Sequence, residues 1–314
     1  METIVGIKGL KEKMAVLKGQ GKMACLERGR RVGLVPTMGA LHEGHLHLIR
    51  RARAENEVVV LSIFVNPLQF DRKDDLKDYP RDLGRDKMLA SREGVDLLFA
   101  PTVEEMYPEG FSTHVEVKGF TDGLCGASRP GHFSGVATVV AKLLNIIRPD
   151  RAYFGQKDFQ QTAVIKRLVS DLNLGVEVVV VPTVREADGL ALSSRNQLLG
   201  PGERQVATAL YRSLLKAREL FALGVCDSKK IVQEMHDVLH RAGIFRIDYI
   251  AVVDPEGLEG LEEARPGAVV ALAAWVGKVR LIDNMTLVPY HTGAGLVELP
   301  NKLIGVNPPK AERV

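Results

Sequence analysis

The sequence predicts an α/β protein in which a parallel sheet with helices on both faces is followed by a smaller α+β domain. Up to Pro182, apolar runs of strand length alternate with segments of helical periodicity, as is typical of a parallel sheet. The run Glu57–Val65 (EVVVLSIFV) is almost continuously apolar and β-branched, as expected of a strand buried on both faces. We therefore predict a first domain over residues 1–182, a second over 183–290 and a loosely ordered tail over 291–314.

The first predicted strand, Val32–Val35, is an apolar run of the length of a buried strand. Pro36 should end it, because proline lacks the N–H that a central strand donates. A tight turn and a helix over His42–Ala54 are expected to follow. The chain before the strand, residues 1–31, is predicted to be a lead-in helix with an apolar face formed by Leu10, Met14 and Leu17.

Strands and helices then alternate through the rest of the first domain. Thr113–Lys118 has the alternating pattern of an exposed strand, and Gly126–Gly135 (GASRPGHFSG) is predicted to be a glycine-rich basic loop. The other predicted strands are Asp96–Ala100, Ala152–Phe154 and Glu177–Val181, and the helices are Arg81–Arg92, Val136–Ile147 and Gly155–Leu172.

The second domain begins with a polar loop, Thr183–Asn196. Two helices and three strands joined by turns should follow it, which is the composition of an α+β domain. The helices are predicted at Gly202–Leu223 and Ser228–Arg241, and the strands at Asp248–Val253, Ala268–Trp275 and Val279–Ile282.

The bulk composition is that of a globular protein in a reducing compartment. Hydrophobic residues make up 46% and charged residues 26% of the chain, and the formal net charge of +3 is too small to indicate nucleic acid or a membrane as a partner. The 3 cysteines are far apart and form no C-x-x-C motif, which favours reduced thiols over a disulfide or zinc framework. With no visible signal peptide and no membrane-spanning run, a cytoplasmic location is predicted.

His42 and His45 lie in the first turn of a predicted helix, where unpaired N–H groups and a partial positive charge favour anions. Residues three apart share one side of that turn, and Gly44 would let a ring or a phosphate approach the backbone. The pattern favours a nucleotide site, and two ordinary surface histidines are the alternative. A metalloprotease H-E-x-x-H motif would need histidine at Leu46, and no Walker loop follows the turn.

Further polar residues recur at the ends of predicted strands and the starts of helices. Each alone is typical of a solvated surface, but together with the two histidines they favour one anion site. Asn66 and Gln69 follow a strand end with a spacing of three, and amides both donate and accept hydrogen bonds, which suits a hydroxy acid. The candidates for phosphate binding are Lys157 after Gly155, Arg129 and His132 in the basic loop, and Ser193, Ser194 and Arg195 in the polar loop.

The chain lacks the motifs of two large enzyme classes. It has no G-x-S-x-G nucleophile elbow and no G-x-G-x-x-G dinucleotide fingerprint. A reaction that needs only positioning and charge stabilisation fits better, such as attack of a carboxylate on the α-phosphorus of ATP. The carboxylate is already ionised at neutral pH, and Lys, Arg, His and Mg²⁺ would screen its repulsion by the phosphates.

Six segments of the chain form a recognisable set. They are Pro36–His45 (PTMGALHEGH), Ser62–Phe70 (SIFVNPLQF), Gly126–Phe133 (GASRPGHF), Phe154–Gln161 (FGQKDFQQ), Gly189–Asn196 (GLALSSRN) and Leu281–Asn284 (LIDN). Together these segments resemble the pantoate–β-alanine ligase family. Two departures are visible: Gln156 stands where many members have an acid, and the tail after Tyr290 is longer than expected.

The resemblance implies a Rossmann-like parallel sheet of the nucleotidylyltransferase type, related to class I aminoacyl-tRNA synthetases, with the smaller C-terminal domain as a lid. It implies that (R)-pantoate and ATP, with Mg²⁺, give pantoyl adenylate and pyrophosphate. The amine of β-alanine then gives pantothenate and AMP, a step of vitamin B5 and coenzyme A biosynthesis. Family members are usually homodimers.

The resemblance also assigns residues. It makes His45 the proton donor and gives pantoate to Gln69 and Gln161, with Gln69 also facing β-alanine; the metal ligands stay open. The implied ATP site consists of Met38, Gly39, Ala40, Leu41, His42, Glu43, Gly44, His45, Gly155, Gln156, Lys157, Asp158, Val184, Leu192, Ser193, Ser194 and Arg195. His42, His45, Lys157, Ser193, Ser194 and Arg195 are the residues expected to act in catalysis.

Two alternatives remain open from the sequence. A cytidylyltransferase of the same superfamily would need more cationic groups for a phosphorylated alcohol and would lack the two pocket glutamines. A nucleotide-binding regulator with an inactive site is disfavoured, because His42, His45, Lys157 and Arg195 are all intact.

Overall fold

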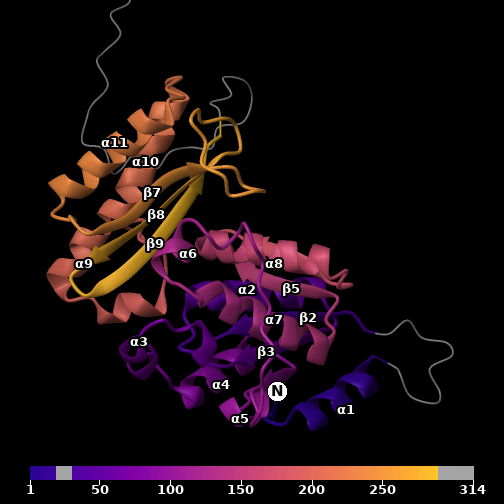
Figure 1. Cartoon of the computed structure of the whole chain (residues 1–314). Helices are drawn as coiled ribbons and strands as arrows, with labels where there is room; N and C mark the ends of the chain where they lie inside the picture. The colour runs from indigo at the N-terminus through magenta and orange to yellow at the C-terminus, as the bar shows by residue number, and fades with distance from the viewer. Residues whose placement is uncertain (19–29, 289–314) are drawn as a thin grey trace, which may run out of the picture.

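The protein consists of two lobes, each built around its own sheet (Figure 1). This computed structural model describes residues 1–18 and 30–288. The large lobe contains a six-stranded sheet, and the small lobe a three-stranded one. The predicted fold class, a parallel α/β sheet followed by a smaller α+β unit, is confirmed. The predicted tail over 291–314 lies outside the described residues, as does most of the lead-in segment after Lys18.

All strand pairs of the large sheet are parallel. After β2 the chain adds β3 and β4 on one side, then crosses to add β5 and β6 on the other. The carboxyl ends of β2 and β5 therefore form a topological switch point, where open α/β sheets bind ligands. In spatial order the strands are β1 (Glu2–Ile4), β4 (Leu97–Phe99), β3 (Val58–Ile63), β2 (Val32–Thr37), β5 (Arg151–Gly155) and β6 (Glu177–Val181).

Helices cover both faces of this sheet. Successive strand residues point to opposite faces, so Leu34 and Val60 join the core beneath α1, α7 and α8, whereas Val35 and Leu61 join the core beneath α2 and α4. The helices are α1 (Ile7–Leu17), α2 (Glu43–Glu55), α3 (Lys73–Lys77), α4 (Leu83–Arg92), α5 (Val103–Met106), α6 (Cys125–Ser128), α7 (His132–Ile147) and α8 (Phe159–Asp171), with 3-10 turns η1 (Pro67–Gln69) and η2 (Gln156–Asp158).

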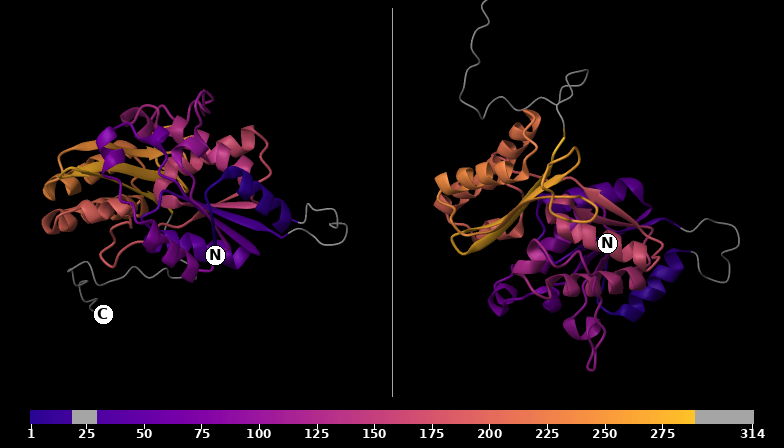
Figure 2. Two further views of the ribbon diagram at one scale, coloured as in Figure 1. Left: turned by 90° about the horizontal axis from the view of Figure 1, so that it is seen from below. Right: turned by 45° about the horizontal axis from the view of Figure 1, so that its top comes forward.

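The small lobe packs three helices on one face of an antiparallel sheet, and the other face of that sheet lies toward the large lobe (Figures 1 and 2). There, Val253, Val269 and Ala271 pack with Phe159 at the start of α8. The elements are η3 (Ser194–Leu198), α9 (Pro201–Ala207), α10 (Ala209–Ala222), α11 (Ser228–Arg241), β7 (Ile247–Val253), β8 (Val269–Val276) and β9 (Val279–Thr286).

Pro36 does not end its strand, contrary to the prediction. Strand β2 continues to Thr37, because beyond Leu34 it pairs only with β3, and a strand edge without a partner tolerates a missing N–H. The predicted strand Thr113–Lys118 is also wrong, since these described residues have no strand partner. The Val115 N–H donates instead to Thr138 Oγ1 at 2.9 Å.

Helix boundaries differ at two further places. Helix α7 begins at His132 inside the predicted glycine-rich loop. Within this helix, position 135 requires glycine because η1 packs directly on it: a Cβ there would collide with the Leu68 carbonyl. The helix predicted over residues 202–223 is two helices, α9 and α10, which meet at Thr208. Strand β9 runs four residues past its predicted end because it stays paired with β8 up to Thr286.

Candidate functional site

A cavity of about 640 Å³ lies between the carboxyl ends of β2 and β5 and the facing sheet of the small lobe. Its walls combine apolar side chains with convergent polar groups from both lobes, which is the usual character of a ligand site. The cavity occupies the switch point of the large sheet, as expected from the strand order.

His42 and His45 stack at the start of α2, with ring centroids 4.0 Å apart. His42 Nδ1 accepts from the Gly44 N–H at 3.1 Å, and His45 Nδ1 accepts from the His42 N–H at 3.3 Å. Each Nδ1 therefore carries a lone pair, so the proton of a neutral ring sits on Nε2. Both imidazoles consequently offer an Nε2–H donor rather than an acceptor.

Burial and the charge of Lys157 keep both rings neutral. Burial is the larger cause and lowers the pKa of His42 to about 4. The pKa of His45 is lowered well below its ordinary value, first by burial and then by His42 and Lys157. In the free protein the two rings therefore act as neutral hydrogen-bond donors, and a bound polyphosphate would push both pKa values upward.

Gly44 makes room for this arrangement. A Cβ at position 44 would lie 2.9 Å from His42 Cε1, so the glycine admits the ring of His42, whereas the sequence predicted room for the ring or phosphate of a ligand. The same contact satisfies the N–H of Gly44. Because the Gly44 N–H is used within the helix start, the donor that faces the cavity here is the Nε2–H of His42.

Asp86 holds the turn that leads into α2. Its carboxylate accepts from the Ala40 N–H at 2.9 Å and from the Leu41 N–H at 2.7 Å, and the residue is 1% exposed. Ala40 has a φ of +51°, in the left-handed region that non-glycine residues rarely adopt. Burial raises the pKa of Asp86. Asp86 was not predicted from the sequence, because it lies 45 to 46 residues from its partners.

Lys157 enters the cavity from the turn after β5, beside the two histidines. Its side chain is 19% exposed, and its Nζ lies 3.8 Å from the Asp158 carboxylate. His42 and His45 line the same cavity as Lys157, and the charge of Lys157 contributes to lowering the pKa of both rings. This region combines one cation with two neutral N–H donors, which suits a polyphosphate.

Gln69 lies at another wall, with its amide orientation fixed. Asn66 Nδ2 donates to Gln69 Oε1 at 3.1 Å, while Asn66 Oδ1 accepts from the Tyr107 hydroxyl at 2.8 Å. Gln69 Nε2 is directed toward Met38 Sδ at 2.9 Å. A thioether is a weak acceptor, so this NH₂ group is available to donate to a ligand. Gln161 also lines the cavity.

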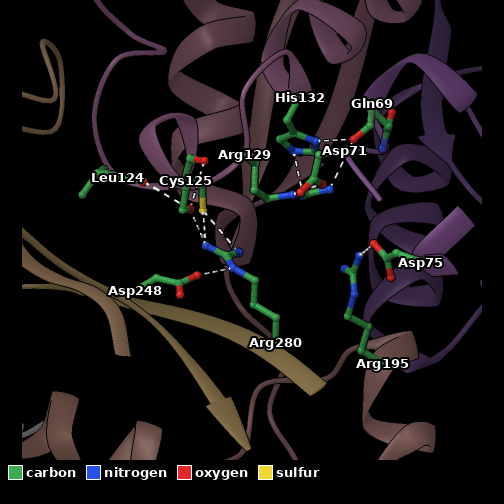
Figure 3. A network of polar contacts seen from close by, with 11 residues as sticks. Gln69, Asp71, Asp75, Leu124, Cys125, Arg129, His132, Arg195, Asp248 and Arg280 are labelled. Atoms are coloured by element: carbon green, nitrogen blue, oxygen red, sulfur yellow. Dashed lines mark hydrogen bonds and ion pairs between the residues drawn. The ribbon is translucent and has the colours of Figure 1, made fainter. Parts of the chain in front are cut away.

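Arg129 and His132 pack behind Gln69 (Figure 3). Arg129 Nε lies 2.9 Å from Asp71, and His132 Nδ1 donates to the Gln69 carbonyl at 2.7 Å. His132 Nε2 is then the acceptor for Arg129, at 3.3 Å. Burial, followed by the nearby Arg129 charge, lowers the pKa of His132 to about 4. Both residues therefore lie at the Gln69 end of the cavity.

Ser193, Ser194 and Arg195 close another side of the cavity. The Arg195 guanidinium pairs with Asp75 of α3 at 2.9 Å (Figure 3), and the Ser194 hydroxyl lies 3.4 Å from that of Tyr79. Ser193 Oγ accepts from the Arg195 N–H at 3.3 Å, which caps η3. The loop is thus tied to the large lobe although it begins the small one.

Two further contacts bridge the lobes around the cavity. Arg280 of β9 pairs with Asp248 and reaches Ser128 Oγ at 3.0 Å, and its guanidinium lies 3.6 and 3.7 Å from the Cys125 sulfur (Figure 3). The Trp275 ring contacts two arginines, with the guanidinium carbon of Arg246 3.9 Å and that of Arg72 5.8 Å from the ring centre. None of these pairings was predicted from the sequence.

Most of the predicted site residues come together in the cavity. Glu43 is exposed and pairs with Arg50, and Gln156 lines a smaller hollow together with Arg185 and Asn284. Of the described residues predicted to bind ATP, those that do not line the main cavity are Gly39, Ala40, Leu41, Glu43 and Gln156; those that do are Met38, His42, Gly44, His45, Gly155, Lys157, Asp158, Val184, Leu192, Ser193, Ser194 and Arg195.

The part of the chain that the structure describes contains no group of three or more His, Cys, Asp or Glu side chains arranged around one point. Over residues 1–18 and 30–288, no helix has both the length and the apolar character needed to cross a membrane.

Comparisons with known proteins agree with this site. The model of the pantoate–β-alanine ligase family matches residues 8–286. The pantothenate synthetase of Moorella thermoacetica is 55% identical over 264 residues, which is 84% of this chain and 93% of that protein. That of Caldicellulosiruptor bescii is 51% identical over 287 residues, or 91% and 99% of the two chains.

Solved structures give the same result. The crystal structure of pantothenate synthetase from Thermus thermophilus has a TM-score of 0.84 and 50% identity, covering 92% of this chain and 100% of that one. The ligase of Francisella tularensis, complexed with "Beta-gamma ATP" and β-alanine, has a TM-score of 0.75 and 36% identity, covering 91% and 97%. The resemblance found in the sequence is thereby confirmed: the chain belongs to the pantoate–β-alanine ligase family.

Proposed function

We propose that this protein joins (R)-pantoate to β-alanine with cleavage of ATP, forming pantothenate, AMP and pyrophosphate through pantoyl adenylate. The observation that carries the proposal is one cavity that holds the Nε2–H donors of His42 and His45, the Lys157 cation and the fixed amide of Gln69. Family membership supports the same reaction and disfavours a cytidylyltransferase or an inactive regulator.

In the first step a pantoate carboxylate oxygen forms a bond to the α-phosphorus, and the bond from that phosphorus to the bridging oxygen of pyrophosphate breaks. In the second step the β-alanine nitrogen attacks the acyl carbon. The bond from that carbon to the oxygen shared with phosphorus breaks, AMP leaves with this oxygen, and the amine loses a proton to solvent. Negative charge grows on the leaving pyrophosphate, so donors placed there lower the barrier.

We assign the residues of the cavity to these steps. His42, His45 and Lys157 donate to the phosphates, with Ser193, Ser194 and Arg195 on the departing pyrophosphate. Gln69 and Gln161 hold pantoate, and Gln69 also faces β-alanine. Arg195 must exchange its Asp75 partner for phosphate oxygens when ATP binds. Met38, Gly44, Gly155, Asp158, Val184 and Leu192 would complete the ATP pocket.

Mg²⁺ fits this donor set as an ion carried in with ATP, because magnesium commonly binds substrate phosphates with only one or two protein carboxylates. Asp158 is the best candidate: the cavity aspartates Asp71, Asp75, Asp248 and Asp283 are each paired with an arginine. Asp158 is 47% exposed, and among the described residues its ion-pair partner is Lys157, at 3.8 Å. The ion would neutralise phosphate charge. A cytoplasmic homodimer is proposed from the family resemblance.

Pantoate-dependent exchange of labelled pyrophosphate into ATP tests the function. Exchange should occur without β-alanine, and bound pantoyl adenylate should accumulate, because the carboxylate must be activated before an amine can displace an oxygen from it. If AMP and pyrophosphate form only when β-alanine is present, with no adenylate trapped, the two-step reaction is wrong. Exchange that needs CTP and a phosphorylated alcohol would indicate the cytidylyltransferase, and no exchange at all would indicate a regulator.

Gln69→Ala should weaken pantoate binding far more than ATP binding, because the Gln69 NH₂ group faces the organic acid. Losing a hydrogen bond to a charged group costs on the order of 1.5–3 kcal/mol, a roughly 10- to 150-fold loss of affinity. Calorimetric titration with each substrate measures the loss of pantoate affinity and the loss of ATP affinity separately. Gln233→Ala, on the exposed face of α11, is the matched control. Equal losses for both substrates would contradict the assignment.

A further inference from the structure

Asn284 of β9 connects the small lobe to the turn that carries Lys157. Its Nδ2 donates to two successive carbonyl oxygens, those of Gln156 at 2.9 Å and Lys157 at 3.0 Å. Its Oδ1 accepts from Gln156 Nε2 at 3.2 Å. The residue is 4% exposed, and because both ends of its carboxamide are hydrogen-bonded, the group has a single orientation.

The backbone around Asn284 is itself held rigidly. Asp283 accepts from the Asn284 N–H at 2.8 Å and forms a two-pronged ion pair with Arg185 at 2.6 and 2.9 Å. The Arg185 guanidinium also lies 4.3 Å from the centre of the Tyr211 ring of α10. A bidentate pair fixes geometry as well as charge. The donor is therefore anchored to the body of the small lobe.

Hydrogen bonds to two successive carbonyls fix two peptide planes, those on either side of the Lys157 Cα. They therefore fix the direction in which the lysine stem leaves the backbone. Neither plane can rotate without leaving the amide of the buried Asn284 without one of its acceptors, which is costly. The position of the Lys157 ammonium thus depends on where β9 lies.

We propose that Asn284 is a positioning residue for Lys157, so that docking of the small lobe and placement of the catalytic cation are one event. This inference rests on the proposed function for the role of Lys157 at the phosphates. If Asn284 only held the lobes together, the effect of removing it would not depend on whether Lys157 is present. A dependence on Lys157 can be measured.

The test is a double-mutant cycle between Asn284→Ala and Lys157→Ala. The readouts are single-turnover pyrophosphate release with pantoate and calorimetric binding of an ATP analogue with a methylene group between its α- and β-phosphorus atoms. In the unmodified background Asn284→Ala should lower adenylation roughly 10-fold, and in the Lys157→Ala background less than about 2-fold, because the lysine through which it acts is already gone.

Arg280→Gln is the matched control. It removes another cross-lobe contact, the one with Ser128 and Cys125. Because this contact does not touch the Lys157 turn, Arg280→Gln should change the adenylation rate by the same factor in the unmodified and Lys157→Ala backgrounds. An equal factor for Asn284→Ala in both backgrounds, or no loss in either, would overturn the proposal. If Asn284→Ala does not fold, Gln156→Ala removes the third hydrogen bond and replaces it in the cycle, with the same pattern expected at smaller amplitude.

The analogue binding separates this inference from the proposed function, because it needs neither pantoate nor turnover. If the unmodified protein shows no pantoate-dependent release of pyrophosphate, the proposed function fails. Coupling between Asn284 and Lys157 would still be visible in analogue affinity.

Discussion

His45→Ala and Lys157→Ala should each lower the rate of adenylate formation by about 10²–10³, the usual effect of removing one preorganised donor from a developing negative charge. The effect should be larger on the rate than on ATP affinity, because charge on the bridging oxygen grows only as the bond breaks. Pantoate affinity should be spared, since Gln69 is held by Asn66 and not by either residue. Single-turnover pyrophosphate release is the measurement.

His47→Ala is the matched control, because His47 lies on the same helix two residues away and is exposed. It should leave the rate unchanged. Near-normal adenylation by both active-site variants would rule out the proposed role of His45 and Lys157 as donors to the phosphates. A covalent nucleotidyl-histidine trapped on the unmodified protein would instead establish nucleophilic catalysis, which the neutral Nε2–H tautomer inferred for both rings argues against.

Asp86→Ala should be strongly destabilising, because it leaves the Ala40 and Leu41 N–H groups buried without an acceptor. An unsatisfied buried donor costs about 1–3 kcal/mol, so the two together should produce one of the larger single-site losses in this protein. Adenylation should fall as well, since the turn they hold leads directly to His42. Urea unfolding gives the free energy, and pyrophosphate release gives the rate.

Asp82→Ala provides the comparison for Asp86. Asp82 caps the same helix, α4, by accepting from the Arg85 N–H at 2.9 Å, and loss of such a cap costs about 1 kcal/mol. It should not affect the rate, because it does not touch the turn. If Asp82→Ala and Asp86→Ala lower the free energy of unfolding equally and Asp86→Ala remains fully active, Asp86 does not hold the active-site turn in place.

The large sheet could be predicted because its strands are short apolar runs separated by helical periodicity, both local signals. Where the prediction failed, a contact with a distant segment of the same chain determined the local structure. Pro36 is tolerated because β2 has lost one neighbour by that point. Val115 bonds to a threonine hydroxyl instead of a strand. Gly135 lies in a helix and leaves room for the backbone of η1, so its glycine does not mark a loop. None of these partners is visible in the local pattern.

The same distinction holds for the site. His42, Gly44 and His45 interact within four residues, so their cluster could be predicted from spacing alone. Asp86, Tyr107 and Asn284 act on groups 41 to 128 residues away, and only folding brings them there. Local sequence therefore identified the groups proposed to meet the substrate, and missed most of those that hold them in place.

Trp275 gives the molecule a built-in optical reporter. It is the 1 tryptophan of the chain, and its ring is near Arg246 of its own lobe and Arg72 at the start of α3 in the other. Its indole N–H also donates to Asp248 at 2.8 Å. Emission from an indole depends on nearby charges, so separation of Arg72 from the ring can be followed by fluorescence without attaching a dye, and no second tryptophan obscures the signal.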